Sequence, residues 1–233
     1  LTGRLWLSGR PLLHFNEGGI LCRYKLNPPL AVVATITFDI HNASAHPRRA
    51  SVYWRVDTDH GAAVLAAEPV DIALAPGQTT VRTVTVTIPD ARLWTPAKPS
   101  LYRLTGWMSE RNRVVDTVSL RTGFREAEFR PNQGFFLNGQ RIELRGCNRH
   151  ASVPGFGSAL PPELHRDDAV AIQSAGLNFV RLSHYPQDPA FLDACDELGL
   201  LVYAEIATWK SVRTGRWLQS ACRQMRAMIE RDR

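Results

Sequence analysis

Cysteine is scarce in this chain, and its spacing excludes a metal framework. Only four cysteines occur among 233 residues, with no C-x-x-C pair and no Cys/His spacing of the kind that binds zinc. They are Cys22, Cys147, Cys195 and Cys222. Each lies in an apolar or helical context, which predicts buried free thiols and gives secretion no support.

Long apolar runs and runs of basic residues are missing as well. No stretch approaches the ~20 apolar residues of a membrane span, and no charged-then-apolar leader opens the chain. The net charge of +6 comes mainly from arginines that are dispersed among Asp and Glu, without a basic stripe. These absences predict a soluble protein with neither a nucleic-acid nor a membrane partner, and they favour the cytoplasm.

The first half of the chain consists of short alternating runs separated by turns. With 233 residues the chain is long enough for two domains that each have a core. The clearest runs are residues 31–40, 51–56, 70–74, 79–88, 101–108 and 114–120, with a turn at 75–77. About seven strands in this length predict an antiparallel immunoglobulin-like sandwich. Cys22 is its only cysteine, so an inter-sheet disulfide is excluded.

The pattern changes across residues 123–139, where phenylalanines alternate with charges and turns. After this boundary, predicted strands at 142–146, 178–182 and 200–203 alternate with predicted helices at 162–175, 189–198 and 216–233. Such alternation predicts a parallel sheet with outer helices. Three strand-helix units fall short of the roughly 250 residues of an eightfold barrel.

Residues 178–203 carry the most specific motif. A short strand at 178–182 carries Arg181 at its C-terminal end, and the polar loop Ser183, His184, Tyr185 and Pro186 follows it. Asp188-Pro189 then predicts a helix start, with Asp as the N-cap and Pro at the first helical position, and a glycine at 199 ends the helix. In sheets of this type ligands bind beyond the carboxyl ends of the strands, where Arg181 and His184 fall.

This run resembles the signature of glycoside hydrolase family 2, the β-galactosidases, β-glucuronidases, β-mannosidases and their relatives. The family pattern is Asn-x-apolar-Arg-small-small-His-Tyr-Pro, then a helix, Asp-x-x-Gly and four apolar residues, and only Leu182 departs from it. Residues 93–102, 123–125, 136–139 and the Gly-Cys-Asn-Arg-His run at 146–150 also resemble family segments, in the family order.

The resemblance implies a domain organisation. It predicts the end of a preceding jelly-roll domain at residues 1–11, an immunoglobulin-like sandwich at 12–122, and the N-terminal part of a TIM-barrel catalytic domain at 123–233. The run at 146–150 would then close the first barrel strand.

It also implies a retaining mechanism that uses two glutamates about 5 Å apart, one as acid/base and one as nucleophile. The family's acid/base follows an Arg-Asp-x-Asn-His-Pro run, and this chain stops at Arg231-Asp232-Arg233. Neither catalytic carboxylate is therefore expected in these residues, and the piece alone is predicted to be inactive.

The resemblance assigns supporting roles to several residues. Arg181 would pair with the nucleophile glutamate, or else form a structural ion pair elsewhere in the barrel, because a buried guanidinium requires a carboxylate. His184 would hydrogen-bond the sugar or the catalytic carboxylates, or else support its loop. Glu205, at the end of the third strand, would support the other groups without being the nucleophile.

Asn148 and His150 are expected to face the same mouth of the barrel, or to serve only their loop, whereas Arg149 is expected to point toward solvent or an adjoining loop. Trp209 would stack on a sugar or pack internally. Asp167 and Asp168 would offset the dipole of the helix that begins near residue 162.

No metal or other cofactor is expected. Family members with a magnesium site carry Asp-Glu-Ala-Asn-x-Glu-x-His where this chain has Ala-Glu-Ile-Ala-Thr-Trp-Lys at 204–210. The departure removes the usual ligands. The sequence thus predicts part of a retaining hydrolase of β-linked glycosides, with a carbohydrate substrate, and is compatible with a homo-oligomeric parent. The rival interpretation is a non-catalytic carbohydrate-binding or scaffold protein that retains the sandwich and part of a barrel.

Overall fold

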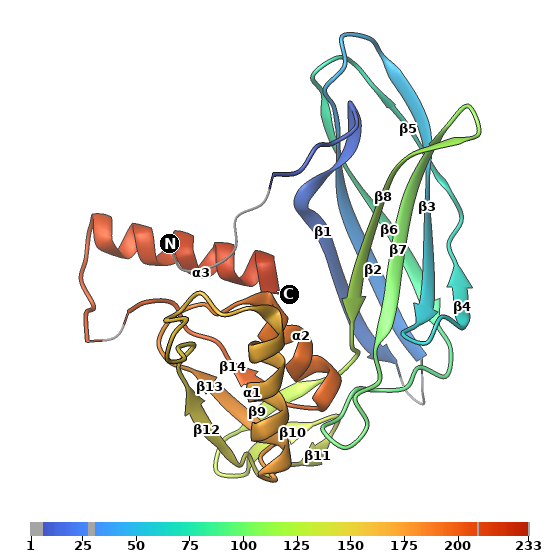
Figure 1. Cartoon of the computed structure of the whole chain (residues 1–233). Helices are drawn as coiled ribbons and strands as arrows, with labels where there is room; N and C mark the ends of the chain where they lie inside the picture. The colour runs from blue at the N-terminus through green and yellow to red at the C-terminus, as the bar shows by residue number, and fades with distance from the viewer. Residues whose placement is uncertain (1–6, 28–30, 209, 233) are drawn as a thin grey trace. The chain divides into compact units, whose positions relative to one another are not determined.

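The computed structural model describes residues 7–27, 31–208 and 210–232, which form two compact units (Figure 1). One unit comprises Leu7–Leu93 and Ser100–Arg125, and the other comprises Trp94–Pro99 and Glu126–Arg233 within the described residues. The short segment Trp94–Pro99 therefore leaves the first unit and belongs to the second. Most of the strand expected within residues 1–11 lies outside the described residues, and residues 7–11 have no regular secondary structure.

The first unit is a sandwich of two antiparallel sheets. One sheet has the order β1-β2-β6, with β1 at Leu13–Asn27, β2 at Ala31–Asn42 and β6 at Thr79–Ile88. The other has the order β4-β3-β7-β8, with β5 also paired to β3. Its strands are β3 (Arg48–Thr58), β4 (Ala63–Ala66), β5 (Val70–Leu74), β7 (Tyr102–Glu110) and β8 (Arg113–Thr122). The six runs predicted from the sequence correspond to β2, β3, β5, β6, β7 and β8, whereas no predicted run corresponds to β1 or β4.

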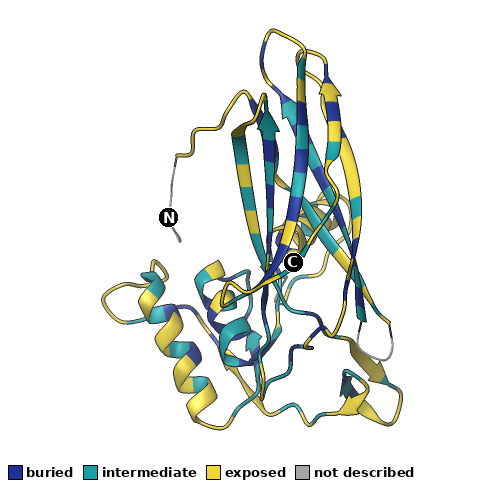
Figure 2. Ribbon diagram, turned by 90° about the vertical axis from the view of Figure 1, so that its right-hand side faces the viewer, coloured by how far each residue is buried: buried dark blue, intermediate teal, exposed yellow. Residues whose placement is uncertain are grey.

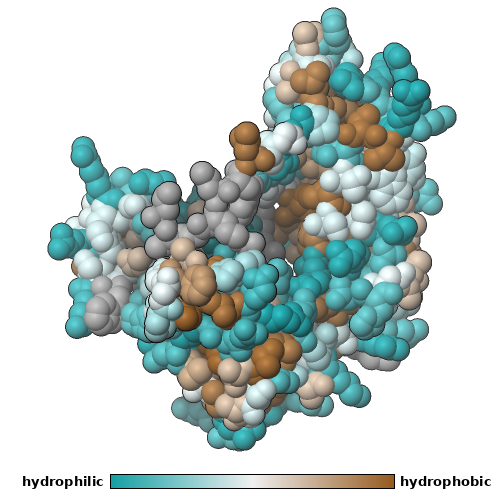
Figure 3. Space-filling view, viewed as in Figure 1, coloured by the Kyte–Doolittle hydropathy of each residue, from teal (hydrophilic) through white to brown (hydrophobic). Residues whose placement is uncertain are grey.

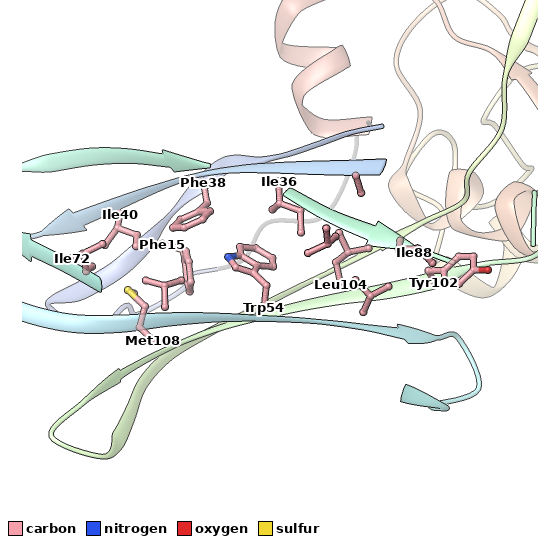
Figure 4. Packing of buried hydrophobic residues seen from close by; sticks show 14 of the residues in the cluster. Phe15, Ile36, Phe38, Ile40, Trp54, Ile72, Ile88, Tyr102, Leu104 and Met108 are labelled. Atoms are coloured by element: carbon pink, nitrogen blue, oxygen red, sulfur yellow. The ribbon is translucent and has the colours of Figure 1, made fainter. Parts of the chain in front are cut away.

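The core of the sandwich lies between its two sheets. The alternation of buried and half-buried residues along β2 places every second side chain inward, as expected for a strand with one covered face (Figure 2). Trp54 of β3 lies at the centre, with Phe15 and Phe38 of the opposite sheet around its indole (Figure 4). Only 1% of Trp54 is exposed, which makes it part of the sandwich core.

The second unit begins with a small antiparallel sheet of order β11-β10-β9, formed by β9 (Ala127–Arg130), β10 (Gly134–Leu137) and β11 (Gln140–Arg141). Two side chains attach the segment 94–99 within this unit. Trp94 Nε1 donates to the carbonyl of Asp196 at 2.8 Å, and Asn138 Nδ2 donates to the carbonyl of Trp94 at 3.0 Å.

Three parallel strands follow in the order β12-β13-β14, at Gly146–Arg149, Phe179–Leu182 and Leu201–Tyr203. The predicted strand at 142–146 is wrong in position, because residues 142–145 are not part of a strand and β12 starts at Gly146. A side chain at 146 would lie 2.2 Å from the carbonyl oxygen of Phe179, so only glycine allows β12 to approach β13 here.

Helices α1 (Pro162–Ser174) and α2 (Pro189–Leu198) cover one face of these strands, and α3 (Arg216–Asp232) follows (Figure 1). Ala169, Val180, Leu182, Phe191 and Ala194 form the buried centre of the covered face. The predicted caps of α2 are confirmed. The Asp188 carboxylate accepts from the Ala190 amide at 2.8 Å, and Gly199 ends the helix with a left-handed φ of 79°.

The surface mixes hydrophilic and hydrophobic residues on the face shown in Figure 3. Over the described part of the chain, no helix is long and apolar enough to cross a membrane. All four cysteines are free thiols, but the prediction that they are buried is wrong for Cys147 and Cys222, which are exposed. Burial raises the pKa of Cys22 to about 11 and also raises that of Cys195.

Candidate active site

The parallel strands place their functional residues by register. Asn148 of β12 lies opposite Arg181 of β13, and Arg181 lies opposite Tyr203 of β14. Laterally paired residues share a face, and Val180 and Leu182 occupy the face that α1 and α2 cover. Asn148 and Arg181 therefore lie on the opposite face of the sheet.

Arg181 and Glu205 form an ion pair at the carboxyl ends of β13 and β14. Arg181 Nε donates to Glu205 Oε1 at 2.5 Å, and His184 Nδ1 lies 3.1 Å from Glu205 Oε2. A carboxylate can only accept, so the His184 proton lies on Nδ1. The 3.4 Å separation between Arg181 Nη2 and that same nitrogen is then a close contact between two donors.

The electrostatics of the cluster keep Glu205 ionised. Only 17% of its side chain is exposed, compared with 21% for His184 and 39% for Arg181. Burial favours the neutral acid, but the hydrogen bonds from Arg181 and His184 outweigh it and lower the pKa of Glu205 below its usual value. With both oxygens engaged and the proton lost, Glu205 acts as a fixed negative charge and is a poor proton donor.

His150 lies next to this cluster. Its ring packs edge-to-face on that of His184, with centroids 5.4 Å apart, and lies 6.2 Å from the ring of Tyr185. The Tyr185 hydroxyl accepts a hydrogen bond from the Ala151 amide at 3.2 Å, which attaches the loop after β12 to the loop after β13. Asn148 is exposed on the same face of the sheet.

The structure thus brings together Arg181, His184 and Glu205 in direct contact, with His150 beside them and Asn148 on the neighbouring strand. Trp209 lies outside the described residues. Within residues 7–27, 31–208 and 210–232, no three His, Cys, Asp or Glu side chains are grouped so that they could hold a metal ion.

The expectation that Arg149 points toward solvent is wrong, whereas its alternative, an adjoining loop, agrees with the contact to Gln187 in the loop after β13. Its side chain is buried beneath α1 and α2, where it donates to Asp168 Oδ2 from Nε at 2.9 Å and from Nη2 at 2.6 Å. Its guanidinium carbon lies 3.9 Å from the centroid of the Phe191 ring. Asp168 is therefore the counterion of Arg149. Both Asp167 and Asp168 lie beyond the first turn of α1, where Glu163 is the acidic residue, so the predicted dipole role is wrong for both.

Sequence reasoning also missed Gln187 and His165, both buried beside Arg149. Arg149 Nη1 donates to Gln187 Oε1, and Arg149 Nη2 lies 3.0 Å from His165 Nδ1. For Arg149, the alternation of side chains along the strand could have predicted its burial. If Asn148 and His150 face the mouth, strand alternation turns Arg149 to the opposite face, which outer helices cover.

Comparison with known proteins decides the family. The family model for the TIM barrel domain of glycosyl hydrolases family 2 matches residues 130–233, and a second model of glycosyl hydrolases family 2 matches residues 23–125. The chain belongs to glycoside hydrolase family 2. Its fold is accordingly a family-2 sandwich followed by the first part of a TIM barrel, as predicted.

Individual relatives carry glycosidase names. A β-galactosidase of Thermoanaerobacter pseudethanolicus is 42% identical over 141 residues, which are 60% of this chain and 19% of that protein. A β-glucuronidase of Bacteroides fragilis is 28% identical over 197 residues, 84% of this chain and 28% of that protein. The crystal structure of a Bacteroides uniformis β-glucuronidase matches with a TM-score of 0.88 at 30% identity, over 95% of this chain and 27% of that one. This chain therefore spans less than a third of the length of each of these three relatives.

Proposed function

We propose that the protein to which this chain belongs hydrolyses β-linked glycosides with retention of configuration at the anomeric carbon. The contact of Arg181 and His184 with Glu205 at the carboxyl ends of parallel barrel strands carries the proposal. Ligands bind at this end of TIM barrels, and the similarity to proteins named β-galactosidase and β-glucuronidase supports a β-glycoside as the substrate.

Within this proposal Glu205 is a supporting carboxylate. A general acid must be protonated near the working pH, whereas the lowered pKa of Glu205 keeps it ionised. The acid/base and the nucleophile are then two other glutamates of the full-length protein, as family-2 resemblance implies. Glu205 orients Arg181 and His184 toward them.

Arg181 has donors left for the nucleophile. A guanidinium offers five N–H donors in a fixed fork, and Glu205 uses only the one on Nε. The Nη donors of a side chain that is 39% exposed can hold a second carboxylate. The two roles weighed from sequence, structural ion pair and nucleophile partner, are thus compatible.

The neighbouring residues complete the proposed substrate side. His184 and His150 present imidazole edges, and Asn148 presents an amide, at the mouth where sugar hydroxyls would lie. Polar groups of this type fix the orientation of a bound sugar. The substrate is a carbohydrate.

The test compares the isolated chain with its full-length parent on a panel of chromogenic β-linked glycosides. We expect turnover only by the parent, and proton NMR of the first-formed sugar should show the β-anomer. Turnover by the pure 233-residue chain that is abolished by Glu205→Gln would instead place catalysis on Glu205. A parent that binds sugars without turnover would support the scaffold interpretation.

A further inference from the structure

The buried side-chain amide of Gln187 contacts both a hydrogen-bond donor and a hydrogen-bond acceptor of Arg149. Its Oε1 accepts from the Arg149 guanidinium, and its Nε2 donates to the Arg149 backbone carbonyl at 3.0 Å. Only 3% of Gln187 and 5% of Arg149 are exposed, so water does not replace these contacts easily. An amide is suited to this place because it presents an acceptor and a donor side by side.

The same carbonyl also receives the backbone of the loop after β13. The Ser183 amide donates to the Arg149 carbonyl at 3.0 Å, so this one oxygen accepts from both ends of the segment that runs from Ser183 to Gln187. His184 and Tyr185 lie between these two anchors. The loop is therefore attached to β12 at its start by a backbone contact and at its end by a side chain.

A hydrogen bond from α3 also holds the backbone of Gln187. Arg231 Nη2, near the end of α3, donates to the Gln187 backbone carbonyl at 2.8 Å. Asp188, the next residue, caps α2 through its side chain, so the chain after Gln187 is also held. Rotation of the Gln187 side chain away from Arg149 would leave buried polar atoms without partners.

We propose that Gln187 is a positioning residue, which through its two contacts with Arg149 holds the loop that carries His184 against β12 and keeps the His184 imidazole on Glu205. The proposal deepens the proposed glycosidase function and rests on it for the kinetic test below. Arg149 provides the anchor, on the opposite face of the strand from Asn148. Residues that never touch the substrate thereby set the geometry of one that would.

Two substitutions separate the contacts. Gln187→Met keeps the length of the side chain and removes both hydrogen bonds. Gln187→Glu keeps an acceptor for the Arg149 guanidinium but places a carboxylate oxygen against the Arg149 carbonyl. Gln173→Met is the matched control, because Gln173 is an exposed glutamine of α1.

The first test is structural and independent of activity. In crystal structures of the 233-residue chain, we expect both Gln187 variants to lose the 3.1 Å contact between His184 Nδ1 and Glu205 Oε2, and Gln173→Met to keep it. Retention of this contact in a folded Gln187→Met or Gln187→Glu variant would overturn the proposal. The result stands whether or not the parent proves to be a glycosidase.

The second test is a double-mutant cycle in the full-length parent, with a chromogenic β-glycoside that it hydrolyses. A displacement of about 1 Å in a supporting group can lower the rate by ten- to a hundredfold, so Gln187→Met should lower kcat/KM by about tenfold or more. In a His184→Ala background the same substitution should have little further effect, because it acts through His184. Fully additive losses would show a general structural defect and would overturn the positioning role.

Discussion

Arg181 lies on β13, Glu205 follows the end of the neighbouring parallel strand β14, and a single short contact joins Arg181 Nε to Glu205 Oε1 at 2.5 Å. This side-on geometry differs from the paired contact in which both Nε and an Nη nitrogen meet one carboxylate. His184 takes the second oxygen of Glu205 instead. One carboxylate thus contacts both Arg181 and His184, and Arg181 Nη2 lies 3.4 Å from His184 Nδ1.

Arg181→Lys should lower kcat in the full-length parent, with a smaller effect on KM. An ammonium is a point charge that cannot hold Glu205 and a second carboxylate in a fixed fork. Loss of one preorganised donor of this kind costs on the order of 3 kcal/mol, about a hundredfold or more in rate. Steady-state kinetics measure this, with circular dichroism to confirm folding.

The matched control is Arg166→Lys, because Arg166 forms an ion pair with Glu197 in which 53% of its side chain is exposed. Surface pairs of this type contribute little, so its kcat should stay near that of the unaltered protein. A folded Arg181→Lys protein with normal kcat would reduce Arg181 to a structural ion-pair residue.

The titration of Glu205 provides a second prediction that needs no substrate. Its folded pKa should lie below the usual 4.5, so the stabilisation from its pairing is present above that value and is lost as the pH falls through the folded pKa. In Arg181→Gln the pKa of Glu205 should rise, because burial remains while the main compensating donor is gone. Carbon-13 NMR of the side-chain carboxyl follows both values in the 233-residue chain.

Arg166→Gln serves as the comparison in this titration, since it removes a remote arginine and should leave the Glu205 curve in place. An unchanged Glu205 pKa in Arg181→Gln would mean that His184 alone sustains the ionised state.

The local sequence was sufficient where a pattern is set by neighbours in the chain. The strands at 70–74 and 79–88 and the helix at 189–198 match the observed elements, because alternation, N-cap and terminal glycine are local signals. The proximity of Arg181 and Glu205 follows from these strand assignments, because residues at the carboxyl ends of neighbouring parallel strands lie at one edge of the sheet, whereas their roles stay predictions.

The partners of buried charges could not be predicted in this way. Asp168 and Gln187 are 19 and 38 residues from Arg149, and only the packing of α1 and the loop after β13 onto the strands brings them together. The exposure of Cys147 has a similar origin. β12 is an outer strand of its three-stranded sheet, so the Cys147 side chain is exposed although its neighbours in the sequence favoured burial.

The Arg149–Asp168 pair should be energetically asymmetric. Asp168→Ala leaves a guanidinium that is 5% exposed without its counterion, whereas Arg149→Met leaves a carboxylate that is 38% exposed and can be hydrated. We expect a loss of about 3 kcal/mol in unfolding free energy for Asp168→Ala and about 1–2 kcal/mol for Arg149→Met. Urea unfolding, followed by a probe within residues 126–232, measures both.

The adjacent Asp167→Ala is the control, because Asp167 is exposed on α1 and its removal should change the unfolding free energy by less than about 0.5 kcal/mol. Equal losses for Arg149→Met and Asp168→Ala would contradict the asymmetry and show that burial of the guanidinium carries no special penalty.

The last prediction concerns the sandwich core, where Gly106 of β7 lies directly opposite Trp54 of β3. A Cβ at 106 would lie 2.8 Å from Cη2 and 2.9 Å from Cζ2 of the indole. The indole cannot move aside, since Phe15 and Phe38 pack on it with ring centroids 6.0 and 5.4 Å away. Gly106→Ala should therefore destabilise the sandwich by about 1–3 kcal/mol, the usual cost of overpacking a core.

Chemical denaturation monitored by Trp fluorescence measures the loss, and Gly9→Ala is the control because a Cβ at 9 meets nothing within 4 Å. The cause can be isolated by a double-mutant cycle. Trp54→Phe replaces the indole with a smaller ring, so Gly106→Ala should cost less in that background than in the unaltered chain. The cycle needs a probe other than Trp54, such as far-ultraviolet circular dichroism. If the cost of Gly106→Ala is the same in both backgrounds, it comes from the β7 backbone and not from the contact with the indole.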